Sequence, residues 1–304
     1  MNHIRVKNLI SSGFLVNGEI ASNIDALSED DFILLQEKLK KEKAFVLSKE
    51  IIKRLLTKEI EILSQFKPVK SITIQDFVKT LNERYSFLQG ILLDKVELKN
   101  IVSINKASNG DVSIIGLVKE ISERDGDTPV VLEDPTGSIE TLIDKKTAER
   151  LCLDDVVAVA GKINNKILFV NKLLFPNIPL RPVNYSEESV RIAFSENEKK
   201  IDADYVIYKN KIQDNIKNKS YEISCPSFVK IKNVTVLVVF STDPINLLNK
   251  RYANIGNRDL LIKTIPDILF TDNGKNMSYK GVSIVSLDNM IDLKTREVKK
   301  IDYV

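Results

Sequence analysis

The sequence predicts a mixed α/β protein with an N-terminal helical region, a central β-barrel and a C-terminal domain built on buried strands. Three observations predict this arrangement. Apolar residues recur at helical spacing in the first 65 residues, whereas short β-rich runs separated by turns fill the middle of the chain. The last third contains near-continuous apolar runs of strand length, at residues 190–194, 234–240, 265–270 and 281–287. At 304 residues, the chain is long enough for two or three domains.

Residues 1–65 are predicted to form a helical domain. One helix begins near Ser28, where acidic residues suit the positive end of a helix dipole, and its apolar stripe is Phe32, Leu35 and Leu39. Ser48 is placed to cap a second helix with the stripe Ile51, Ile52, Leu55 and Leu56. Residues 66–72 contain a proline and break the pattern, so they are predicted to be a linker.

Residues 73–176 are predicted to form one helix followed by a five-stranded barrel. The helix spans 75–93 and places one apolar face at Phe77, Leu81, Tyr85, Leu88 and Leu92. The residues beyond it change to β-rich runs at 112–118, 130–132 and 139–143, then a short helix at 145–151, then runs at 156–161 and 167–170. Three strands, a helix and two more strands is the order of an OB barrel.

An OB barrel that binds single-stranded nucleic acid presents aromatic faces with basic neighbours. Phe169 and Phe175 are the only aromatic residues between Ile101 and Pro176. The sequence therefore favours a barrel that docks another protein over one that stacks bases. Lys119 and Arg124, near the first hairpin, are the candidate phosphate contacts.

The chain has a single histidine, His3, close to its N-terminus. This count excludes Ser-His-Asp, Cys-His and histidine-metal chemistry, and leaves carboxylate-only Mg²⁺ chemistry, lysine chemistry or no catalysis. The 45 basic and 42 acidic residues give a net charge of +3, so nucleic-acid binding requires a local basic patch. Two distant cysteines and the absence of a membrane-length apolar run predict a cytoplasmic protein that does not contact a membrane.

Six short segments, in this order and spacing, resemble the small subunit of the archaeal family-D DNA polymerase: residues 76–78, 84–88, 97–100, 103–106, 111–116 and 132–137. The resemblance implies an OB barrel joined to a calcineurin-like phosphoesterase αβ sandwich, here truncated and placed at residues 177–304. It also implies a large catalytic subunit as the partner, in a heterodimer or larger complex, with DNA contacted directly or through that partner.

In this family, aspartates and histidines at the ends of the phosphoesterase strands hold two metal ions. The corresponding positions in this chain carry other residues: Glu196, Glu198, Lys211, Phe240, Phe270, Asn273 and Lys275. Lys211 stands where the carboxylate that bridges both metals is expected, and an ammonium group there repels divalent cations at short range. The resemblance therefore implies a phosphoesterase domain with an inactivated exonuclease site.

The sequence favours a non-catalytic accessory subunit without a cofactor, whose former pocket is filled by Phe240, Phe270 and Lys211. One competing hypothesis is a nuclease or phosphodiesterase in which a substitute carboxylate site of Glu196, Glu198, Asp214 and Asp272 binds Mg²⁺ or Mn²⁺. The other is a free-standing OB protein that binds single-stranded DNA.

Overall fold

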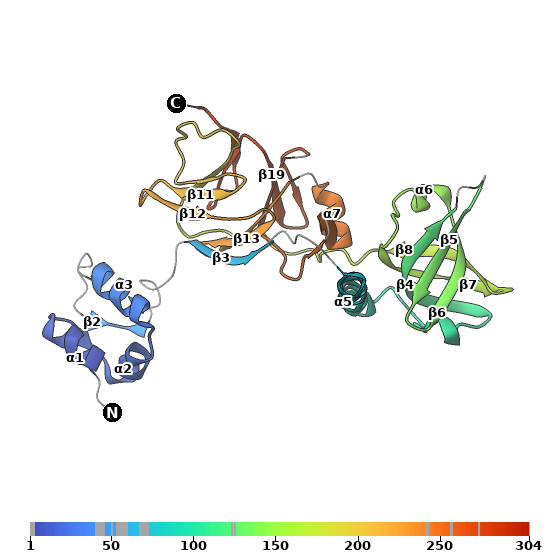
Figure 1. Ribbon diagram of the computed structural model, residues 1–304, viewed down its shortest axis with the longest axis horizontal. Coiled ribbons are helices and arrows are strands. Elements are labelled where there is room, and N and C mark those ends of the chain that lie inside the picture. Colours follow the sequence, from blue (N-terminus) through green and yellow to red (C-terminus); the bar gives the residue numbers. More distant parts are fainter. Residues whose placement is uncertain are drawn as a thin grey trace. The chain divides into compact units, whose positions relative to one another are not determined.

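The computed structural model describes residues 4–39, 46–49, 51–52, 60–66, 73–122, 124, 126–240, 243–255, 258–272 and 274–303. The chain divides into two compact units, Met1–Glu61 and Ile62–Val304 (Figure 1). Within the described ranges, every helix is too short or too polar to span a membrane.

The first unit is predominantly helical, as the sequence predicts. Its helices are α1 (Ile4–Ser11), α2 (Gly18–Asp25) and α3 (Glu29–Leu39), and a small parallel sheet joins β1 (Leu15–Val16) to β2 (Val46–Leu47). The predicted stripe Phe32, Leu35 and Leu39 is buried in the core of this unit. The Ser48 hydroxyl accepts a hydrogen bond from the Ile51 amide, as expected of a helix cap. Leu55, Leu56 and residues 67–72 lie outside the described residues.

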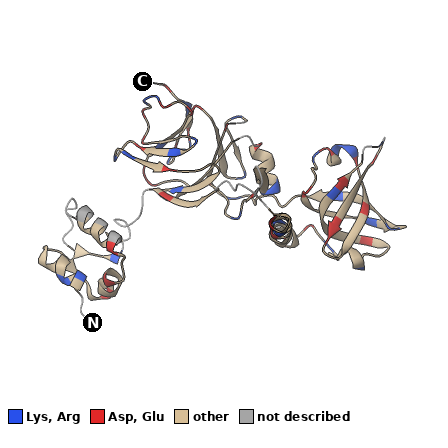
Figure 2. Ribbon diagram, viewed as in Figure 1, with Lys and Arg blue, Asp and Glu red and all other residues tan. Residues whose placement is uncertain are grey.

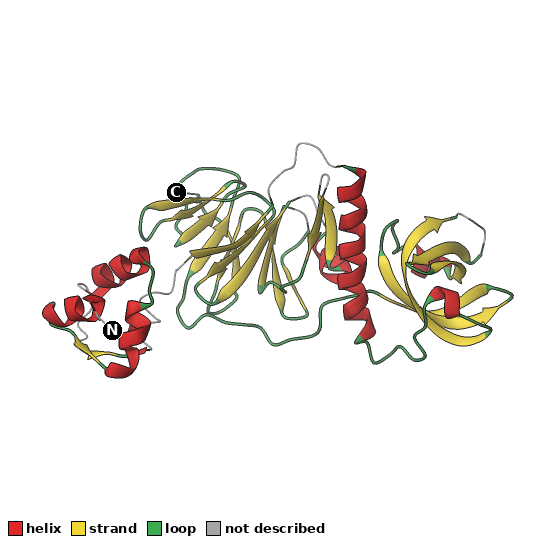
Figure 3. Ribbon diagram, turned by 60° about the horizontal axis from the view of Figure 1, so that its bottom comes forward, coloured by secondary structure: helices red, strands yellow, loops and turns green. Residues whose placement is uncertain are grey.

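Helix α5 (Ile74–Leu93) confirms the predicted helix and is the longest red helix in Figure 3. Thr73 and Asp76 close its N-terminus with a reciprocal capping box. The two halves of the helix differ in their surroundings. Tyr85, Leu88 and Leu92 are buried against the outer face of the barrel. Phe77, which the sequence places on the same apolar face, keeps 49% of its surface exposed, and Ile74 and Val78 are also exposed.

The central strands form a closed five-stranded barrel, which confirms the predicted OB-type architecture. Its neighbours follow the order β4-β5-β6-β8-β7, the Greek-key order expected of this barrel. The strands and short helices of this domain are η1 (Ile104–Lys106), β4 (Gly110–Ile121), β5 (Thr128–Asp134), β6 (Gly137–Ile143), α6 (Lys145–Ala148), β7 (Val156–Asn164) and β8 (Ile167–Leu174). Inward residues such as Ile114, Val130 and Val159 fill the barrel with an apolar core.

The C-terminal part contains two six-stranded sheets. The first has the order β12-β11-β10-β9-β20-β21 and the second the order β18-β19-β17-β14-β13-β3. The first sheet consists of β9 (Arg191–Phe194), β10 (Tyr205–Ile207), β11 (Lys211–Asp214), β12 (Lys219–Glu222), β20 (Asn289–Asp292) and β21 (Val298–Lys300). The second consists of β3 (Ile60–Gln65), β13 (Ser227–Ile231), β14 (Val234–Val239), β17 (Ile268–Thr271), β18 (Met277–Tyr279) and β19 (Val282–Ser286).

The predicted buried strands are confirmed as β9, β14, β17 and β19, whose inward residues are shielded from solvent. Helix α7 (Pro244–Lys250) and the hairpin of β15 (Tyr252–Ile255) and β16 (Arg258–Leu261) follow β14 and contribute apolar residues to the core on the second sheet. From the sequence, residues 60–65 are predicted to belong to the N-terminal helical region, and this prediction is wrong because these residues form a strand. They form β3 at the edge of the second sheet, where the Gln65 side chain accepts a hydrogen bond from the Ser224 amide.

Candidate functional site

Most of the predicted site residues lie in loops that follow the parallel strands of the two sheets. Strands β9 and β10 are parallel in the first sheet, and β14, β17 and β19 are parallel in the second. Ligands in open sheets are commonly bound beyond the carboxyl ends of parallel strands. Residues 195–198, 208–211, 240, 272, 274 and 275 lie at these ends, so this edge is the candidate site.

Three phenylalanine rings meet between the two sheets at this edge. The ring centroid of Phe194 lies 5.4 Å from that of Phe240 and 5.2 Å from that of Phe270, in tilted geometry. Phe194 and Phe270 are completely buried. The Lys209 ammonium lies 5.7 Å from the centroid of Phe240 and covers the outer ring. Two positions where the family resemblance expects histidine ligands therefore hold hydrocarbon rings packed against Phe194, of which Phe270 is completely buried and Phe240 is half-buried.

Lys211 is neutralised by a neighbouring carboxylate. Its Nζ lies 2.7 Å from Glu198 Oε1, so the two positions that the resemblance assigns to metal ligands pair with each other. The same Nζ lies 5.1 Å from the ring centroid of Tyr208. Burial raises the pKa of the Tyr208 phenol, and the charge of Lys211 opposes that shift.

The loop after β9 is fixed by the C-terminal segment. Ser195 is buried, its hydroxyl lies 3.1 Å from the Tyr303 hydroxyl, and it donates to Asp288 at 3.4 Å. Tyr303 in turn donates to the same Asp288 oxygen at 2.5 Å. Glu196, the next residue of the loop, is exposed to solvent. The segment that the resemblance aligns with the first metal-binding motif therefore forms a turn that is hydrogen-bonded to residues near the C-terminus.

The structure does not assemble the four carboxylates of the proposed substitute site. Asp214 on β11 is the register partner of Tyr205 on β10, and Tyr205 is the register partner of Ile192 on β9. Asp214 therefore lies level with Ile192, two residues before Phe194, the last residue of β9. Its side chain is fully buried; Oδ1 accepts from the Lys217 amide at 3.0 Å, and Oδ2 has no hydrogen-bond partner among the described residues. Asp272 is exposed, as is Lys275, and Asn273 lies outside the described residues.

These side chains do not fit a two-metal phosphoesterase centre. Phenylalanine offers no donor atom at positions 240 and 270, and the Lys211–Glu198 ion pair brings a cation where a bridging carboxylate is expected. Within the described ranges, no group of three or more histidine, cysteine, aspartate or glutamate side chains is arranged to hold a metal ion.

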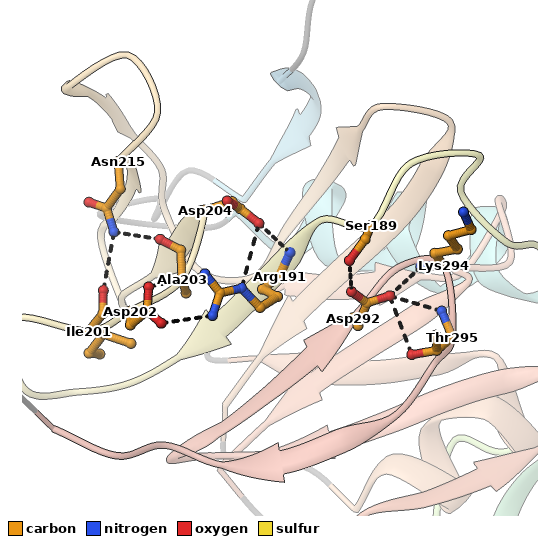
Figure 4. A network of polar contacts seen from close by, with 10 residues as sticks. All are labelled: Ser189, Arg191, Ile201, Asp202, Ala203, Asp204, Asn215, Asp292, Lys294 and Thr295. Atoms are coloured by element: carbon orange, nitrogen blue, oxygen red, sulfur yellow. Dashed lines mark hydrogen bonds and ion pairs between the residues drawn. The ribbon is translucent and has the colours of Figure 1, made fainter.

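A second polar network occupies the amino end of β9 (Figure 4). Arg191 forms two hydrogen bonds to Asp202, at 2.9 and 3.0 Å, and its amide donates to Asp204. The hydrogen bond to Asp202 raises the pKa of Arg191 and lowers that of Asp202. Asn215 donates to the Ala203 carbonyl at 2.8 Å in the same group. Each of these polar side chains forms its hydrogen bonds with other residues of the same group, which is typical of a structural network.

The two predicted phosphate contacts on the barrel are not brought together into a basic patch. Lys119 Nζ lies 2.9 Å from Glu133, and the hydrogen bond to this carboxylate raises the pKa of Lys119. Arg124 is exposed and lines a hollow of about 610 Å³ with Thr128, Lys145 and Glu149. Pairing of Lys119 with Glu133 reduces the net positive charge that this hairpin offers to a phosphate.

A buried polar bridge connects α5, the barrel and the C-terminal sheets, and sequence reasoning missed it. Arg84 donates from Nε and Nη2 to the two oxygens of Asp259 at 2.5 Å each, and from Nη1 to the Asp154 carbonyl at 3.0 Å. Its guanidinium lies 4.3 Å from the ring centroid of Tyr252. The side chains of Arg84 and Asp259 are 2% and 3% exposed.

Asp155 extends the same bridge. Lys250 Nζ lies 2.6 Å from its Oδ2, and the Tyr252 hydroxyl donates to its Oδ1 at 2.7 Å. Burial and the charge of Asp155 both raise the pKa of the Tyr252 phenol. An arginine on the otherwise apolar buried face of α5 is the one sequence signal for this bridge, because buried charges require partners. The positions of its partners follow from the tertiary fold alone.

Comparison with known proteins identifies relatives for part of the chain. A 139-residue alignment with the DNA polymerase II small subunit of Archaeoglobus fulgidus is 30% identical and covers 42% of this chain and 28% of that protein. An alignment over 115 residues with the same subunit of Methanothermobacter thermautotrophicus is 29% identical and covers 35% of this chain and 24% of the relative. Part of this chain is similar in sequence to the archaeal DNA polymerase II small subunit. The resemblance to the family-D small subunit seen in the sequence is thereby confirmed.

The matched region spans about a quarter of each of these small subunits. No family model matches the chain. Solved structures with local likeness include an OBody bound to hen egg-white lysozyme, with 14% identity, 26% of this chain and 95% of that chain covered, and a TM-score of 0.24. The Schizosaccharomyces pombe Stn1–Ten1 complex has 21% identity, coverages of 21% and 56%, and a TM-score of 0.20. The OB-type assignment of the barrel rests on its own strand order.

Proposed function

We propose that this chain is a non-catalytic accessory subunit of an archaeal family-D DNA polymerase and that it scaffolds the large catalytic subunit. The observation that carries the proposal is the 30% identity to a DNA polymerase II small subunit over 139 residues. The OB-type barrel, followed by two sheets with parallel central strands, agrees with the barrel and phosphoesterase sandwich that the family resemblance implies. In this proposal, residues 177–304 are a truncated phosphoesterase domain whose exonuclease site is inactive.

The side chains at the family's metal positions support the loss of the exonuclease. Phe240 and Phe270 contact Phe194, and Lys211 is paired with Glu198. Asp214, which the nuclease hypothesis requires, is buried on β11 away from the loop that carries Glu196 and Glu198. The described residues of this site provide core packing and a surface ion pair, and they offer no set of oxygen ligands for Mg²⁺.

The first two turns of α5 are the candidate docking surface for the large subunit. Ile74, Phe77 and Val78 keep 83%, 49% and 48% of their surfaces exposed. Ile74 and Val78 line a groove of about 970 Å³, together with Phe87 and the basic residues Lys79 and Lys263. Apolar anchors in a groove with a charged rim are characteristic of protein interfaces, and a DNA polymerase partner is indicated by the sequence relation.

Co-expression with the large polymerase subunit of the same organism tests the proposal. We expect the two chains to copurify and to elute together in size-exclusion chromatography, with a mass that light scattering resolves as a defined complex. Recovery of the two chains in separate peaks at micromolar concentration would contradict the accessory role. A second assay follows the hydrolysis of 3′-labelled single-stranded DNA in Mg²⁺ or Mn²⁺ by this chain alone, and we expect no release above the buffer control. Metal-dependent release that Asp214→Ala or Glu196→Ala abolishes would support the nuclease hypothesis instead.

A further inference from the structure

One aromatic ring stands exposed on the outer face of the barrel. Of the two phenylalanines between Ile101 and Pro176, Phe175 is buried at 6% exposure, whereas Phe169 keeps 46% of its surface exposed. Phe169 lies on β8, between the fully buried Leu168 and Val170, whose side chain packs against the barrel core. Alternation along a strand therefore directs the Phe169 ring away from that core.

The neighbours of Phe169 are defined by strand register. Lys162 on β7 is directly opposite Phe169, and Leu142 on β6 is opposite it on the other side. Helix α5 covers the other end of this face, where Val156 and Ala158 belong to the cluster that packs under Tyr85 and Leu88. The Phe169 end of the same face is left uncovered by the helix.

The backbone beneath the ring is tightly held. The register between β7 and β8 shifts between Ala160 and Gly161, and a Cβ atom at Gly161 would lie 2.0 Å from the Phe169 carbonyl oxygen. Glycine is therefore required at this close approach, which brings the backbone of Phe169 against β7. Because the backbone that carries the Phe169 ring is already ordered, binding a ligand to this ring costs little backbone conformational entropy.

Three exposed lysines lie on the two strands β7 and β8 and on the hairpin between them. Lys162, Lys166 in the β7–β8 hairpin and Lys172 on β8 are all exposed, and none of the three forms an ion pair within the part of the chain that the structure describes. Two acidic residues, Asp111 opposite Lys162 and Glu140 opposite Ile167, belong to the same group of strands. Figure 2 shows basic residues on several barrel strands and on α6, with acidic residues interspersed. The local excess of charge around Phe169 is positive.

We propose that this face of the barrel, defined by Phe169, Lys162, Lys166 and Lys172, binds single-stranded nucleic acid. A base stacks on the Phe169 ring, and the phosphates on either side of that base lie near the three lysines. An unpaired strand is the ligand that matches both features, because in a duplex the base faces are stacked on one another and only the base edges and the phosphates remain accessible. Asn164, Asn165 and Asn171 are also exposed on β7, the hairpin and β8, so these strands present polar groups rather than the apolar surface that a protein partner requires. The proposal is independent of the polymerase role, because the isolated chain itself contains the whole site.

Fluorescence anisotropy with labelled oligothymidylate of about twelve nucleotides tests the site in the full chain. We expect Phe169→Ala to weaken binding about 5- to 150-fold, as stacking of one base is worth roughly 1–3 kcal/mol. Phe169→Tyr keeps the ring and is expected to retain the affinity within about threefold. Leu153→Ala removes another exposed apolar residue of the barrel domain, at 59% exposure, and is expected to leave the affinity unchanged. A parallel titration with oligouridylate shows whether DNA or RNA is preferred.

Salt dependence provides a second readout that a folding defect does not reproduce. Each lysine that contacts a phosphate contributes about 0.7 to the slope of log affinity against log salt for a single strand. Substitution of Lys162, Lys166 and Lys172 by glutamine is therefore expected to flatten the slope by about 2 while the thermal midpoint is retained. The proposal is overturned by equal affinity of wild type and Phe169→Ala, by the absence of binding at 50 mM salt, or by tighter binding of duplex than of single strand.

Discussion

Arg84 holds both carboxylate oxygens of Asp259 at 2.5 Å, although 175 positions separate the two residues in the chain. The pair connects the helix that packs on the barrel with the hairpin that follows α7, and it is sealed from solvent. Two parallel hydrogen bonds to one carboxylate give arginine a fixed orientation that a single contact does not provide. We infer that this bridge holds the barrel against the C-terminal sheets as one unit.

Arg84→Met is expected to lower the free energy of unfolding by about 3–5 kcal/mol, because it leaves the Asp259 carboxylate buried without its partner. Urea denaturation followed by circular dichroism measures the loss. Lys79→Met is the matched control on the same helix, because the Lys79–Glu83 pair is 4.0 Å apart and both side chains are more than 60% exposed. Its expected effect is below about 0.5 kcal/mol.

The double variant Arg84→Met with Asp259→Leu separates loss of the bridge from burial of an unpaired charge. Removal of both charges is expected to cost less than Arg84→Met alone, because no unpaired carboxylate remains. An Arg84→Met midpoint no lower than that of Lys79→Met would show that the bridge contributes nothing to stability.

Phe270→Ala is expected to destabilise the C-terminal domain by about 3–5 kcal/mol, because the completely buried ring projects from the second sheet and packs against Phe194 of the first. Thermal unfolding measures the effect. Phe77→Ala is the matched control, because the same side chain is removed from an exposed position of α5, and its expected effect is within about 0.5 kcal/mol. A Phe270→Ala protein as stable as wild type would show that the packing between the two sheets does not depend on this ring.

The docking surface predicted on α5 is tested with Phe77→Asp and Val78→Asp. A carboxylate buried in an apolar interface is expected to weaken binding of the large subunit at least 10-fold, since central apolar anchors are worth about 2 kcal/mol or more. Surface plasmon resonance with the immobilised large subunit measures the change. Val96→Asp introduces the same charge at a residue that is 90% exposed, just beyond α5, and is expected to leave the affinity unchanged. Equal affinities for all three variants would place the interface elsewhere.

The barrel and the buried strands could be predicted from the sequence because local signals determine them. The order of β-rich runs and turns between residues 112 and 170 matches the strand order of the closed barrel. Residues 60–65 gave no such signal. Their strand pairs with β13, more than 150 residues later in the chain, and a short edge strand of mixed polarity shows neither helical nor strand periodicity clearly.

The residue types of the candidate site could be predicted from the sequence, but most of the contacts between them could not. The sequence shows phenylalanines and a lysine at positions that the family resemblance aligns with metal ligands, but not that Lys211 pairs with Glu198 or that Phe194 completes the aromatic cluster. Their shared carboxylate chemistry places Asp214 with Glu196 and Glu198 in the substitute metal site. The strand register shows instead that Asp214 lies away from the loop that carries the two glutamates. The exposure of Phe169, in contrast with the burial of Phe175, depends on the bulged pairing of β7 and β8.

Alkaline pH is expected to weaken the fold through Tyr85. Its hydroxyl donates to the Ile115 carbonyl at 3.1 Å, and burial raises its pKa from 10.0 to about 12, with a further increase from Asp134. The neutral phenol is thus favoured in the folded state. Its contribution to stability is complete below pH 10, and it declines between pH 10 and about 12, where the unfolded chain loses this proton and the folded chain keeps it.

Tyr85→Phe isolates this contribution. Below pH 10, the variant is expected to be less stable than wild type by about 1 kcal/mol, because the hydrogen bond to Ile115 is lost. As the pH rises from 10 to 12, the difference between wild type and variant is expected to narrow, since phenylalanine does not titrate. Urea unfolding at intervals of half a pH unit measures the trend. Leu88→Ala, a buried change on the same helix face without a titratable group, is expected to give a difference from wild type that is constant with pH, and a Tyr85→Phe difference equally constant would exclude a role for the buried phenol.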